Sequence, residues 1–176
     1  MKNDDQRIKK KDILAGKIFV YPTDTIYGLG CNALNKKAVK KLKELKKRDE
    51  NKPLSVIAPS FAWIEENCII DTNLHHYLPG QYTVILKKKE RNFLPWISKS
   101  DEIGIRIPDH LITKDIQRAN VPFITTSVNI SGEKPIIHIS EIPPQIKNTI
   151  DIIVDGGMLN GKPSTIIKGG KEIKRV

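Results

Sequence analysis

The segment Lys17-Ile-Phe-Val-Tyr-Pro-Thr-Asp-Thr-Ile-Tyr-Gly-Leu-Gly30 is the strongest indicator of the architecture of this chain. Its residues 17–21 predict a short buried strand, because the run is almost entirely apolar and aromatic. Pro22 has no backbone N–H and therefore ends the strand and begins a polar loop. Open α/β sheets present ligand-binding residues in the loops that follow such strands. Residues 23–27 therefore form either a ligand-binding loop or an ordinary turn.

Beyond this segment, helical and strand patterns mix without a strict repeat. In residues 36–48, apolar side chains recur every three or four positions with lysines between them, which predicts an amphipathic helix. The strands at 82–86 and 103–107 have no helix between them long enough for a parallel crossover, so we expect both parallel and antiparallel pairings. Further strands are predicted at 53–58, 122–127, 150–154 and, as the last one, 164–168, and further helices at 61–67, 73–77 and 111–119. The predicted fold class is α/β: a single-domain twisted open sheet with mixed parallel and antiparallel strands and helices packed on it.

Length and composition limit the class of protein. The 176 residues correspond to about one domain, and 28% charged with 39% hydrophobic residues is a globular composition. Residues 1–12 are expected to form a basic N-terminal segment and residues 13–176 the folded domain. Because no apolar run reaches the roughly 18 residues that cross a bilayer, and the N-terminus has no signal-peptide core, we expect a cytoplasmic protein without membrane contact. Cys31 and Cys68 have neither metal nor disulfide spacing and are expected to be reduced and buried.

The charge of the chain predicts an anionic partner. Lys and Arg number 30 against 20 Asp and Glu, for a net charge of +10, which attracts RNA, a nucleotide or a membrane surface alike. Lys46, Arg48 and Lys52 come at and just beyond the end of the predicted helix. Cations at this position are either stabilised by the helix dipole for structural reasons alone, or they bind phosphates as a cluster.

Two further segments carry polar groups near strand ends. Arg106 alternates with isoleucines in Ile103-Gly-Ile-Arg-Ile-Pro108, so its side chain points to the face opposite theirs. That face is either solvent or a cleft in which a guanidinium would bind a carboxylate. Residues 125–132, Thr-Thr-Ser-Val-Asn-Ile-Ser-Gly, are rich in side chains that are costly to bury without hydrogen-bond partners, which a ligand could supply. These residues indicate a basic, hydroxyl-rich cleft for an anionic, nucleotide-like ligand.

Several common catalytic and binding motifs are missing. Residues 28–33 fit G-x-G-x-x-A, but six residues separate the first glycine from the strand end. No strand ends on an acid about 20 residues later, which argues against a dinucleotide fold. The chain has no Walker loop, no G-x-S-x-G and no H-E-x-x-H motif, and the four histidines are expected at the surface or at helix ends: His75, His76, His110 and His138. The sequence therefore assigns neither a catalytic nucleophile nor a metal ligand.

Six segments, in the same order, resemble the YrdC-like family, the threonylcarbamoyl-AMP synthases. They are Pro22-Thr-Asp-Thr-Ile-Tyr-Gly-Leu-Gly30, Lys46-Lys-Arg48 with Lys52-Pro-Leu54, Pro79-Gly80 with Thr83, Arg106-Ile-Pro108, Ser127-Val-Asn129 with Ser131-Gly132, and Ser164-Thr-Ile166. Each segment is weakly specific by itself, but the ordered set spans the chain from about residue 13 to residue 176. The resemblance implies that residues 13–176 form a YrdC-like catalytic domain.

The resemblance implies a nucleotidyltransferase, an L-threonylcarbamoyladenylate synthase. Such an enzyme combines L-threonine, bicarbonate and ATP into threonylcarbamoyl-adenylate with release of pyrophosphate, and a separate transferase complex then modifies tRNA. In this chain Thr23, Tyr27 and Arg106 would bind threonine. The nucleotide and its phosphates would contact Lys46, Arg48, Lys52, Thr125, Ser127, Asn129, Ser164 and Arg175. A Mg²⁺ ion bound mainly through the ATP phosphates is implied, as is a contact with tRNA or double-stranded RNA.

The sequence departs from the family pattern at three places. Ile57 stands where many relatives have His, so a threonine contact from that position is lost. Gln81 replaces the second proline of Pro-Gly-Pro, and we expect the C-terminal domain of longer relatives to be absent after Val176. The main alternative function is a non-catalytic basic RNA-binding module, whose binding would depend strongly on salt. The few aromatic residues available for base stacking disfavour a reader of single strands.

Overall fold

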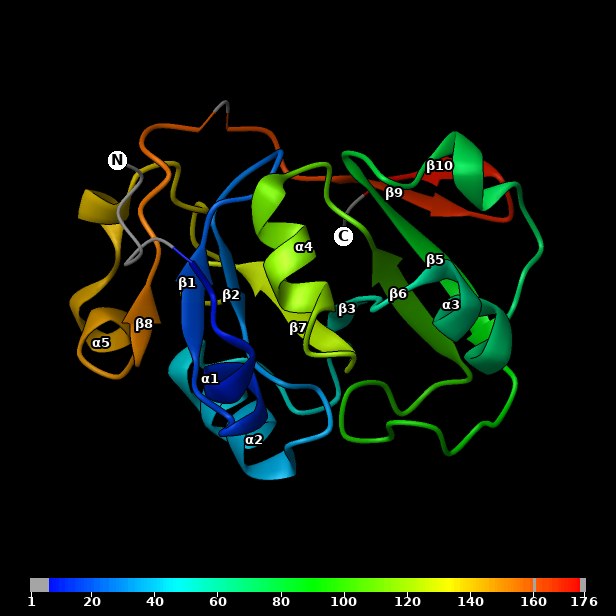
Figure 1. Ribbon diagram of the computed structural model, residues 1–176, viewed down its shortest axis with the longest axis horizontal. Coiled ribbons are helices and arrows are strands. Elements are labelled where there is room, and N and C mark those ends of the chain that lie inside the picture. Colours follow the sequence, from blue (N-terminus) through cyan, green and yellow to red (C-terminus); the bar gives the residue numbers. More distant parts are fainter. Residues whose placement is uncertain (1–6, 160, 175–176) are drawn as a thin grey trace.

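A mixed β-sheet forms the centre of the molecule (Figure 1). The computed structural model describes residues 7–159 and 161–174, and within them the strand order is β10-β9-β5-β6-β3-β7-β2-β1-β8, with β4 beside β5. The strands are β1 (Phe19–Tyr21), β2 (Gly28–Gly30), β3 (Ser55–Ile57), β4 (Cys68–Ile69), β5 (Tyr82–Lys88), β6 (Glu102–Arg106), β7 (Phe123–Ser127), β8 (Ile152–Ile153), β9 (Thr165–Lys168) and β10 (Lys171–Ile173). The helices are α1 (Lys10–Leu14), α2 (Lys36–Leu45), α3 (Phe61–Asn67), α4 (Leu111–Gln117) and α5 (Pro144–Lys147), with 3₁₀ turns at Leu74–His76 and Ile139–Glu141.

Parallel and antiparallel strand pairs occur in the same sheet. β1 pairs with β8, β3 with β6 and β5 with β9 in parallel, whereas β2 pairs antiparallel with β1 and β7, and β5 pairs antiparallel with β6. The order ends in β10 on one side and β8 on the other, so the sheet is open and does not close into a barrel. The predicted fold class is therefore confirmed.

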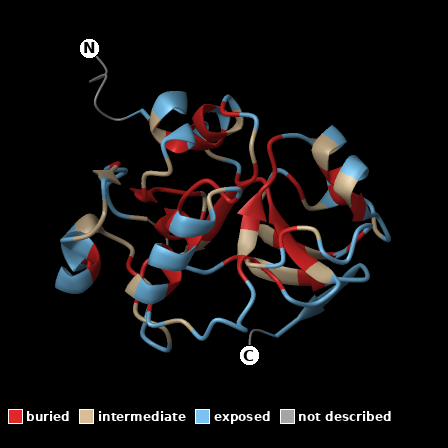
Figure 2. Cartoon of the chain, turned by 90° about the horizontal axis from the view of Figure 1, so that it is seen from below, coloured by how far each residue is buried: buried red, intermediate tan, exposed pale blue. Residues whose placement is uncertain are grey.

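The two faces of the sheet are covered by different helices. One core cluster joins branched side chains of the central strands to α2 and α3: Val56, Val84, Ile105, Ile124, Val39, Leu42 and Ile64. A second, smaller cluster joins the opposite face to α1 and α4: Phe19, Tyr21, Ile57, Phe123, Ile13, Ile112 and Ile116. In Figure 2 the buried strands lie between helices whose outer faces are exposed. The smaller cluster covers only part of its face, and the rest of that face is open to a cavity.

Three predicted elements have different ends from those expected. The helix predicted over 36–48 ends at Leu45, because Lys46 is its C-cap and Lys47 adopts a positive φ of 48°. The strand predicted over 150–154 shortens to Ile152–Ile153. The prediction that 164–168 is the last strand was wrong, because β10 follows it across the glycine turn at 169–170.

Several short elements were not predicted: α1, β2, β4, α5 and β10. β2 is only Gly-Leu-Gly, and β10 is exposed at every position, so neither shows the apolar alternation that marks a strand. Their hydrogen-bond partners in the sheet hold them, which a local pattern does not reveal.

Residues 7–12, at the end of the expected basic N-terminal segment, pack against α4. Ile8 is buried in the smaller cluster, and Arg7 Nη2 lies 3.0 Å from Asp115 Oδ1. Both Cys31 and Cys68 are free and buried, as expected. Across the described part of the chain, no helix has the length and apolar character needed to span a membrane.

Candidate functional site

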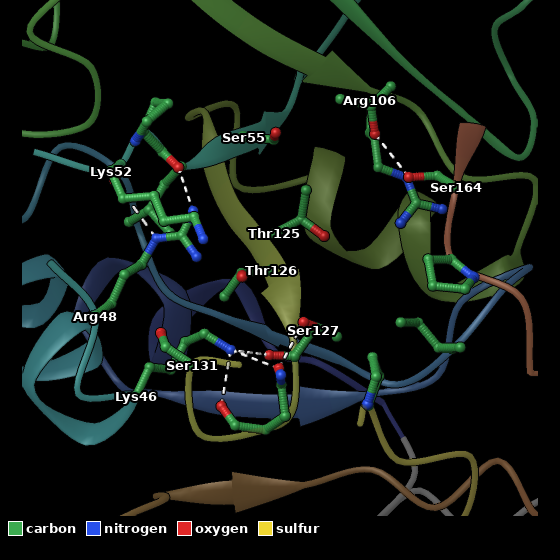
Figure 3. Close-up of a pocket in the computed structure, with 18 of the residues that line it drawn as sticks. Lys46, Arg48, Lys52, Ser55, Arg106, Thr125, Thr126, Ser127, Ser131 and Ser164 are labelled. Carbon is green, nitrogen blue, oxygen red and sulfur yellow. Dashed lines mark hydrogen bonds between the residues drawn. The ribbon is translucent and has the colours of Figure 1, made fainter. Parts of the chain in front are cut away.

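A cavity of about 500 Å³ lies over the face of the sheet that α4 leaves uncovered. Because side chains alternate along a strand, each strand contributes every second residue to it. The lining side chains from these strands and the segments before them are Ser55, Thr83, Ile85, Arg106, Thr125, Ser127, Ser164 and Ile166. Figure 3 shows Arg106 and Ser164 on one side of the cavity and Arg48, Lys52 and Lys46 on the other.

The floor of the cavity depends on a residue without a side chain. A Cβ at Gly104 would lie against Ser55 Oγ and 3.3 Å from Thr83 Cγ2. Glycine in β6 therefore lets three neighbouring strands present hydroxyl groups at close spacing. This explains why glycine alternates with isoleucine immediately before Arg106.

Arg106 points into the cavity, so the structure excludes the solvent-exposed alternative. Its side chain is 8% exposed, and its Nη2 donates to Asp24 Oδ1 at 2.8 Å and to Thr25 Oγ1 at 3.2 Å. Burial lowers the pKa of Arg106, and the carboxylate of Asp24 opposes that shift. The Nε of Arg106 is buried and has no hydrogen-bond partner among the described residues.

Thr23 and Tyr27 are used mainly by the loop that carries them. Thr23 Oγ1 donates to the Ile26 carbonyl at 2.7 Å and accepts from the Thr25 N–H at 3.1 Å, and Thr23 is not among the residues that line the cavity. Tyr27 lines the cavity, but its hydroxyl donates to the Gly157 carbonyl at 2.7 Å. Burial raises the pKa of Tyr27. Of the three residues predicted to bind threonine, Arg106 is therefore the one whose polar group is best placed for it.

Lys46 lines the cavity with its ammonium group bound to the segment after β7. Its Nζ donates to the carbonyl oxygens of Ser127 and Asn129 and to Asn129 Oδ1. Burial, with the nearby positive charges of Arg48 and Lys52, lowers the pKa of Lys46 to about 7. Lys46 therefore shapes the polar segment 127–131 as well as adding charge to the cavity.

Arg48 and Lys52 lie on the same side of the cavity as Lys46. Arg48 donates from Nη2 to the Pro53 carbonyl and from Nε to the Lys52 carbonyl at 3.4 Å, which fixes the turn before β3. Lys52 is exposed at the mouth of the cavity. With Arg106, four cationic side chains line the cavity, and no aspartate or glutamate among the described residues does. This arrangement favours an anionic ligand.

The predicted hydroxyl and amide residues also converge on the cavity. Thr125, Ser127, Asn129 and Ser164 all line it. Ser127 Oγ donates to Asn129 Oδ1 at 2.6 Å, and the hydroxyls of Thr83 and Ser164 are 2.8 Å apart. The remaining predicted nucleotide contact, Arg175, lies outside the described residues.

Sequence reasoning missed four polar groups of this cavity: Ser55, Thr83, Thr126 and Ser131. Ser131 Oγ is buried without a hydrogen-bond partner among the described residues. Ser55 and Thr83 occupy alternate positions in strands that were correctly predicted, so the facing of each strand could have identified them. The missing information was which strands lie side by side.

A second, basic groove of about 380 Å³ lies along the outer side of α2. Its cationic lining residues are Lys36, Lys40, Lys43, Lys47, Arg48 and Lys99. Lys36 Nζ lies 4.5 Å from the ring centroid of Trp96 in the same groove. Arg48 lines both the groove and the cavity.

The histidines show no metal-binding arrangement. His110 Nδ1 accepts the N–H of Ile112 and His138 Nδ1 accepts the N–H of Ser140, which makes both residues caps of short helical segments. Within residues 7–159 and 161–174, no group of three or more His, Cys, Asp or Glu side chains could hold a metal ion.

Comparisons with known proteins agree with this site. The family model Sua5_yciO_yrdC, described as "Telomere recombination", matches residues 11–176. A Methanocaldococcus jannaschii protein named "Putative threonylcarbamoyl-AMP synthase" is 42% identical over 94% of this chain and 83% of its own length. A Pseudoalteromonas atlantica protein named "Threonylcarbamoyl-AMP synthase" is 33% identical over 90% of this chain and 89% of its own.

The fold also matches a solved structure. The crystal structure of P. abyssi Sua5 complexed with L-threonine superimposes with a TM-score of 0.80 at 31% identity, over 90% of this chain. The chain spans 49% of that longer protein. The match over residues 11–176, the identity to these relatives and the shared fold together show that the chain belongs to the Sua5/YciO/YrdC family.

Proposed function

We propose that this protein is an L-threonylcarbamoyl-AMP synthase, which joins L-threonine, bicarbonate and ATP and releases pyrophosphate. The observation that carries the proposal is one cavity with Arg106 on one side and Lys46, Arg48 and Lys52 on the other (Figure 3). A carboxylate and a polyphosphate would each meet a cationic side chain there. The names of the two curated relatives and the threonine complex of Sua5 support the same substrates.

In this proposal the protein acts by positioning and by neutralising charge. The amino group of threonine attacks bicarbonate, which gives a carbamate with loss of water. A carbamate oxygen then attacks the α-phosphate of ATP, forming the mixed anhydride as the bond to pyrophosphate breaks. Arg106 holds the threonine carboxylate, and the three cations opposite stabilise the charge that develops on the phosphates. No covalent bond to the protein is needed.

We propose that Mg²⁺ enters with ATP, mainly as a ligand of the phosphates. Mg²⁺ prefers oxygen ligands and keeps several waters when it binds with nucleotides. The neutral oxygens nearest the basic residues are the Ser127 hydroxyl and the Asn129 amide oxygen, both in the cavity wall. These two residues would hold the ion, which would supply further charge neutralisation.

The proposal extends to the setting of the reaction. Residues 13–176 would be the catalytic domain, acting in the cytoplasm, and the adenylate would pass to a transferase complex that modifies tRNA. Ser127, Asn129, Thr125 and Ser164 would contact the nucleotide.

Pyrophosphate release from ATP tests this function. Purified protein with Mg²⁺ receives threonine and bicarbonate singly and together, and release is expected only when both are present. Arg106→Ala should abolish most of the release, whereas the matched variant Arg118→Ala should not, because Arg118 lies on α4 and pairs with Asp115. Absence of release from folded wild-type protein in every mixture would refute the proposal.

A second candidate function, a contact with RNA, is favoured by the basic groove along α2. Six cations beside Trp96 suit a phosphodiester backbone. Binding of double-stranded and single-stranded RNA should weaken steeply with salt. Lys40→Ala should reduce the slope of log affinity against log salt by about 1 if Lys40 contacts a phosphate. Lys171→Ala, on the distant strand β10, is the control, and equal slopes for all three proteins would exclude this groove.

A further inference from the structure

Asp24 is the one acidic side chain that the structure pairs with Arg106 among the described residues. The two side chains are each only 8% exposed, and Arg106 Nη2 lies 2.8 Å from Asp24 Oδ1. The second carboxylate oxygen of Asp24 accepts the backbone N–H of Asp109 at 3.0 Å. Both oxygens of Asp24 are therefore engaged, and neither is directed at the cavity, of which Asp24 is not a lining residue.

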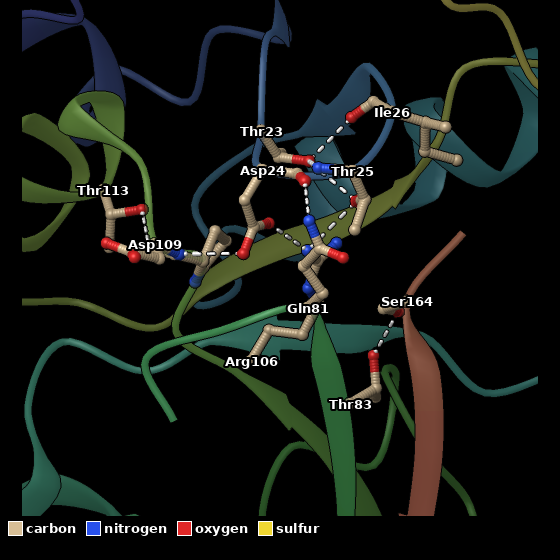
Figure 4. A network of polar contacts seen from close by, with 11 residues as sticks. Thr23, Asp24, Thr25, Ile26, Gln81, Thr83, Arg106, Asp109, Thr113 and Ser164 are labelled. Atoms are coloured by element: carbon tan, nitrogen blue, oxygen red, sulfur yellow. Dashed lines mark hydrogen bonds and ion pairs between the residues drawn. The ribbon is translucent and has the colours of Figure 1, made fainter. Parts of the chain in front are cut away.

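These contacts tie together segments that are far apart in the sequence. The loop 22–27 carries Asp24, and β6 with the turn after it carries Arg106 and Asp109. Gln81, which precedes β5, donates from Nε2 to the Asp24 carbonyl at 2.7 Å. Figure 4 shows Asp24 between Arg106 and Asp109, with Gln81 beside them. Asp24 therefore stands where the loop, β6 and the β5 entry meet.

The pairing fixes the direction of the guanidinium. Both contacts of Nη2, to Asp24 and to Thr25, lie on the loop side, and the plane of an arginine side chain is rigid. The remainder of the group is therefore presented to the cavity at one angle. A buried guanidinium without a counter-charge would also be costly, which Asp24 prevents.

We propose that Asp24 is the positioning residue for Arg106: it holds the guanidinium in the orientation that binds the carboxylate of the amino-acid substrate. Asp24 touches neither substrate and acts through Arg106 alone. This inference rests on the proposed function, because it assigns the ligand of Arg106 as an amino-acid carboxylate. Its consequence is selective: loss of the Asp24 charge impairs the use of threonine and leaves the phosphate side of the cavity intact.

Steady-state kinetics of pyrophosphate release test the selectivity. Asp24→Asn keeps the shape of the side chain but removes its charge and places an amide N–H where the Asp109 N–H now donates. The KM for threonine should rise about tenfold or more, since a charge-assisted hydrogen bond is lost, while the KM for ATP changes by less than about twofold. An unchanged threonine KM, or an equal rise in both KM values, would overturn the proposal.

Two further variants separate the carboxylate from the loop contact. Gln81→Ala removes the hydrogen bond to the Asp24 backbone and leaves the ion pair, so its threonine KM should stay near that of the wild type. If Gln81→Ala reproduced the effect of Asp24→Asn, the loop contact would be responsible and the proposal wrong. Asp24→Glu keeps the charge on a longer stem and should raise the threonine KM less than Asp24→Asn. If Asp24→Asn does not fold, Asp24→Glu decides alone, and a wild-type KM for it would count against the proposal.

A readout independent of activity distinguishes this proposal from the proposed function. In protein labelled with [¹⁵N]arginine, the Nε–H resonance of Arg106 is assigned by its loss in Arg106→Lys. Its hydrogen exchange should be slow in the wild type, because that atom is buried, and faster in the Asp24 variants. Unchanged exchange would show that Asp24 does not position Arg106, whether or not the wild type releases pyrophosphate. Faster exchange without pyrophosphate release by the wild type would support the positioning role and refute the proposed substrate.

Discussion

At the level of single residues, the ammonium group of Lys46 is an unusual feature of the molecule. The side chain is 1% exposed and its Nζ faces three oxygen acceptors in the segment 127–129. Burial and two neighbouring cations lower its pKa from 10.5 to about 7. The protonation of Lys46 is therefore coupled to folding.

This coupling predicts a dependence of stability on pH. Between the folded pKa of about 7 and the unfolded value of 10.5, the unfolded chain binds more protons, so the free energy of unfolding should rise with pH in that window. Urea titrations at several pH values should show a steeper rise for the wild type than for Lys46→Met. Lys47→Met, at the exposed neighbouring position, should retain the wild-type slope, and equal slopes in all three proteins would contradict the prediction.

The chemistry of single residues was partly predictable from the sequence. Alternation with isoleucines correctly placed Arg106 on the opposite face from them, but it could not show whether that face was solvent or cleft. That outcome depends on Asp24, which is 82 residues away in the chain. The use of the Thr23 hydroxyl within its own loop likewise depends on the exact path of that loop.

At the level of elements, β2 shows how a strand can form without a strand-like sequence. Gly30 lies opposite Phe19 of β1, and a Cβ there would overlap the Ile124 carbonyl oxygen and approach Phe123 Cε1 to 2.5 Å. Glycine is required because β7 and the ring of Phe123 come so close. The same glycines that allow the strand remove the apolar signal that would have predicted it.

Gly30→Ala should therefore destabilise the protein through β2. We expect a loss of about 3 kcal/mol, at the upper end of the usual cost of overpacking, because backbone atoms must move. Leu34→Ala, at a position that is 49% exposed after the same strand, should cost far less. The free energy of unfolding in urea measures both, and similar losses for the two variants would show that the close approach is unimportant.

At the level of the whole molecule, two cores of unequal size share one sheet. The larger core lies under α2 and α3, while the smaller one joins α1 and α4 to part of the other face. The strand positions not covered by α4 form the cavity floor. The amphipathic patterns of the helices predicted the two layers, but the order of the strands, and hence the place of the cavity, required long-range pairings such as β5 with β9.

The smaller core predicts a separation between stability and function. Ile13 is fully buried beneath α4, so Ile13→Ala should lower the free energy of unfolding by about 2–5 kcal/mol. Leu14→Ala on the same helix is the control, since Leu14 is 48% exposed. Below the melting temperature of the variant, both KM values should match the wild type. A selective change in one of them would mean that α1 influences the cavity.

The four cations around a cavity without a lining carboxylate also govern what the protein binds between turnovers. Mobile counter-ions concentrate in such a place, and multivalent ones do so most strongly. Phosphate or sulfate buffers should therefore compete with ATP, and more so than chloride at the same ionic strength. Pyrophosphate, the product of the proposed reaction, belongs to the same class of ion, so turnover should slow as it accumulates and recover when a pyrophosphatase removes it.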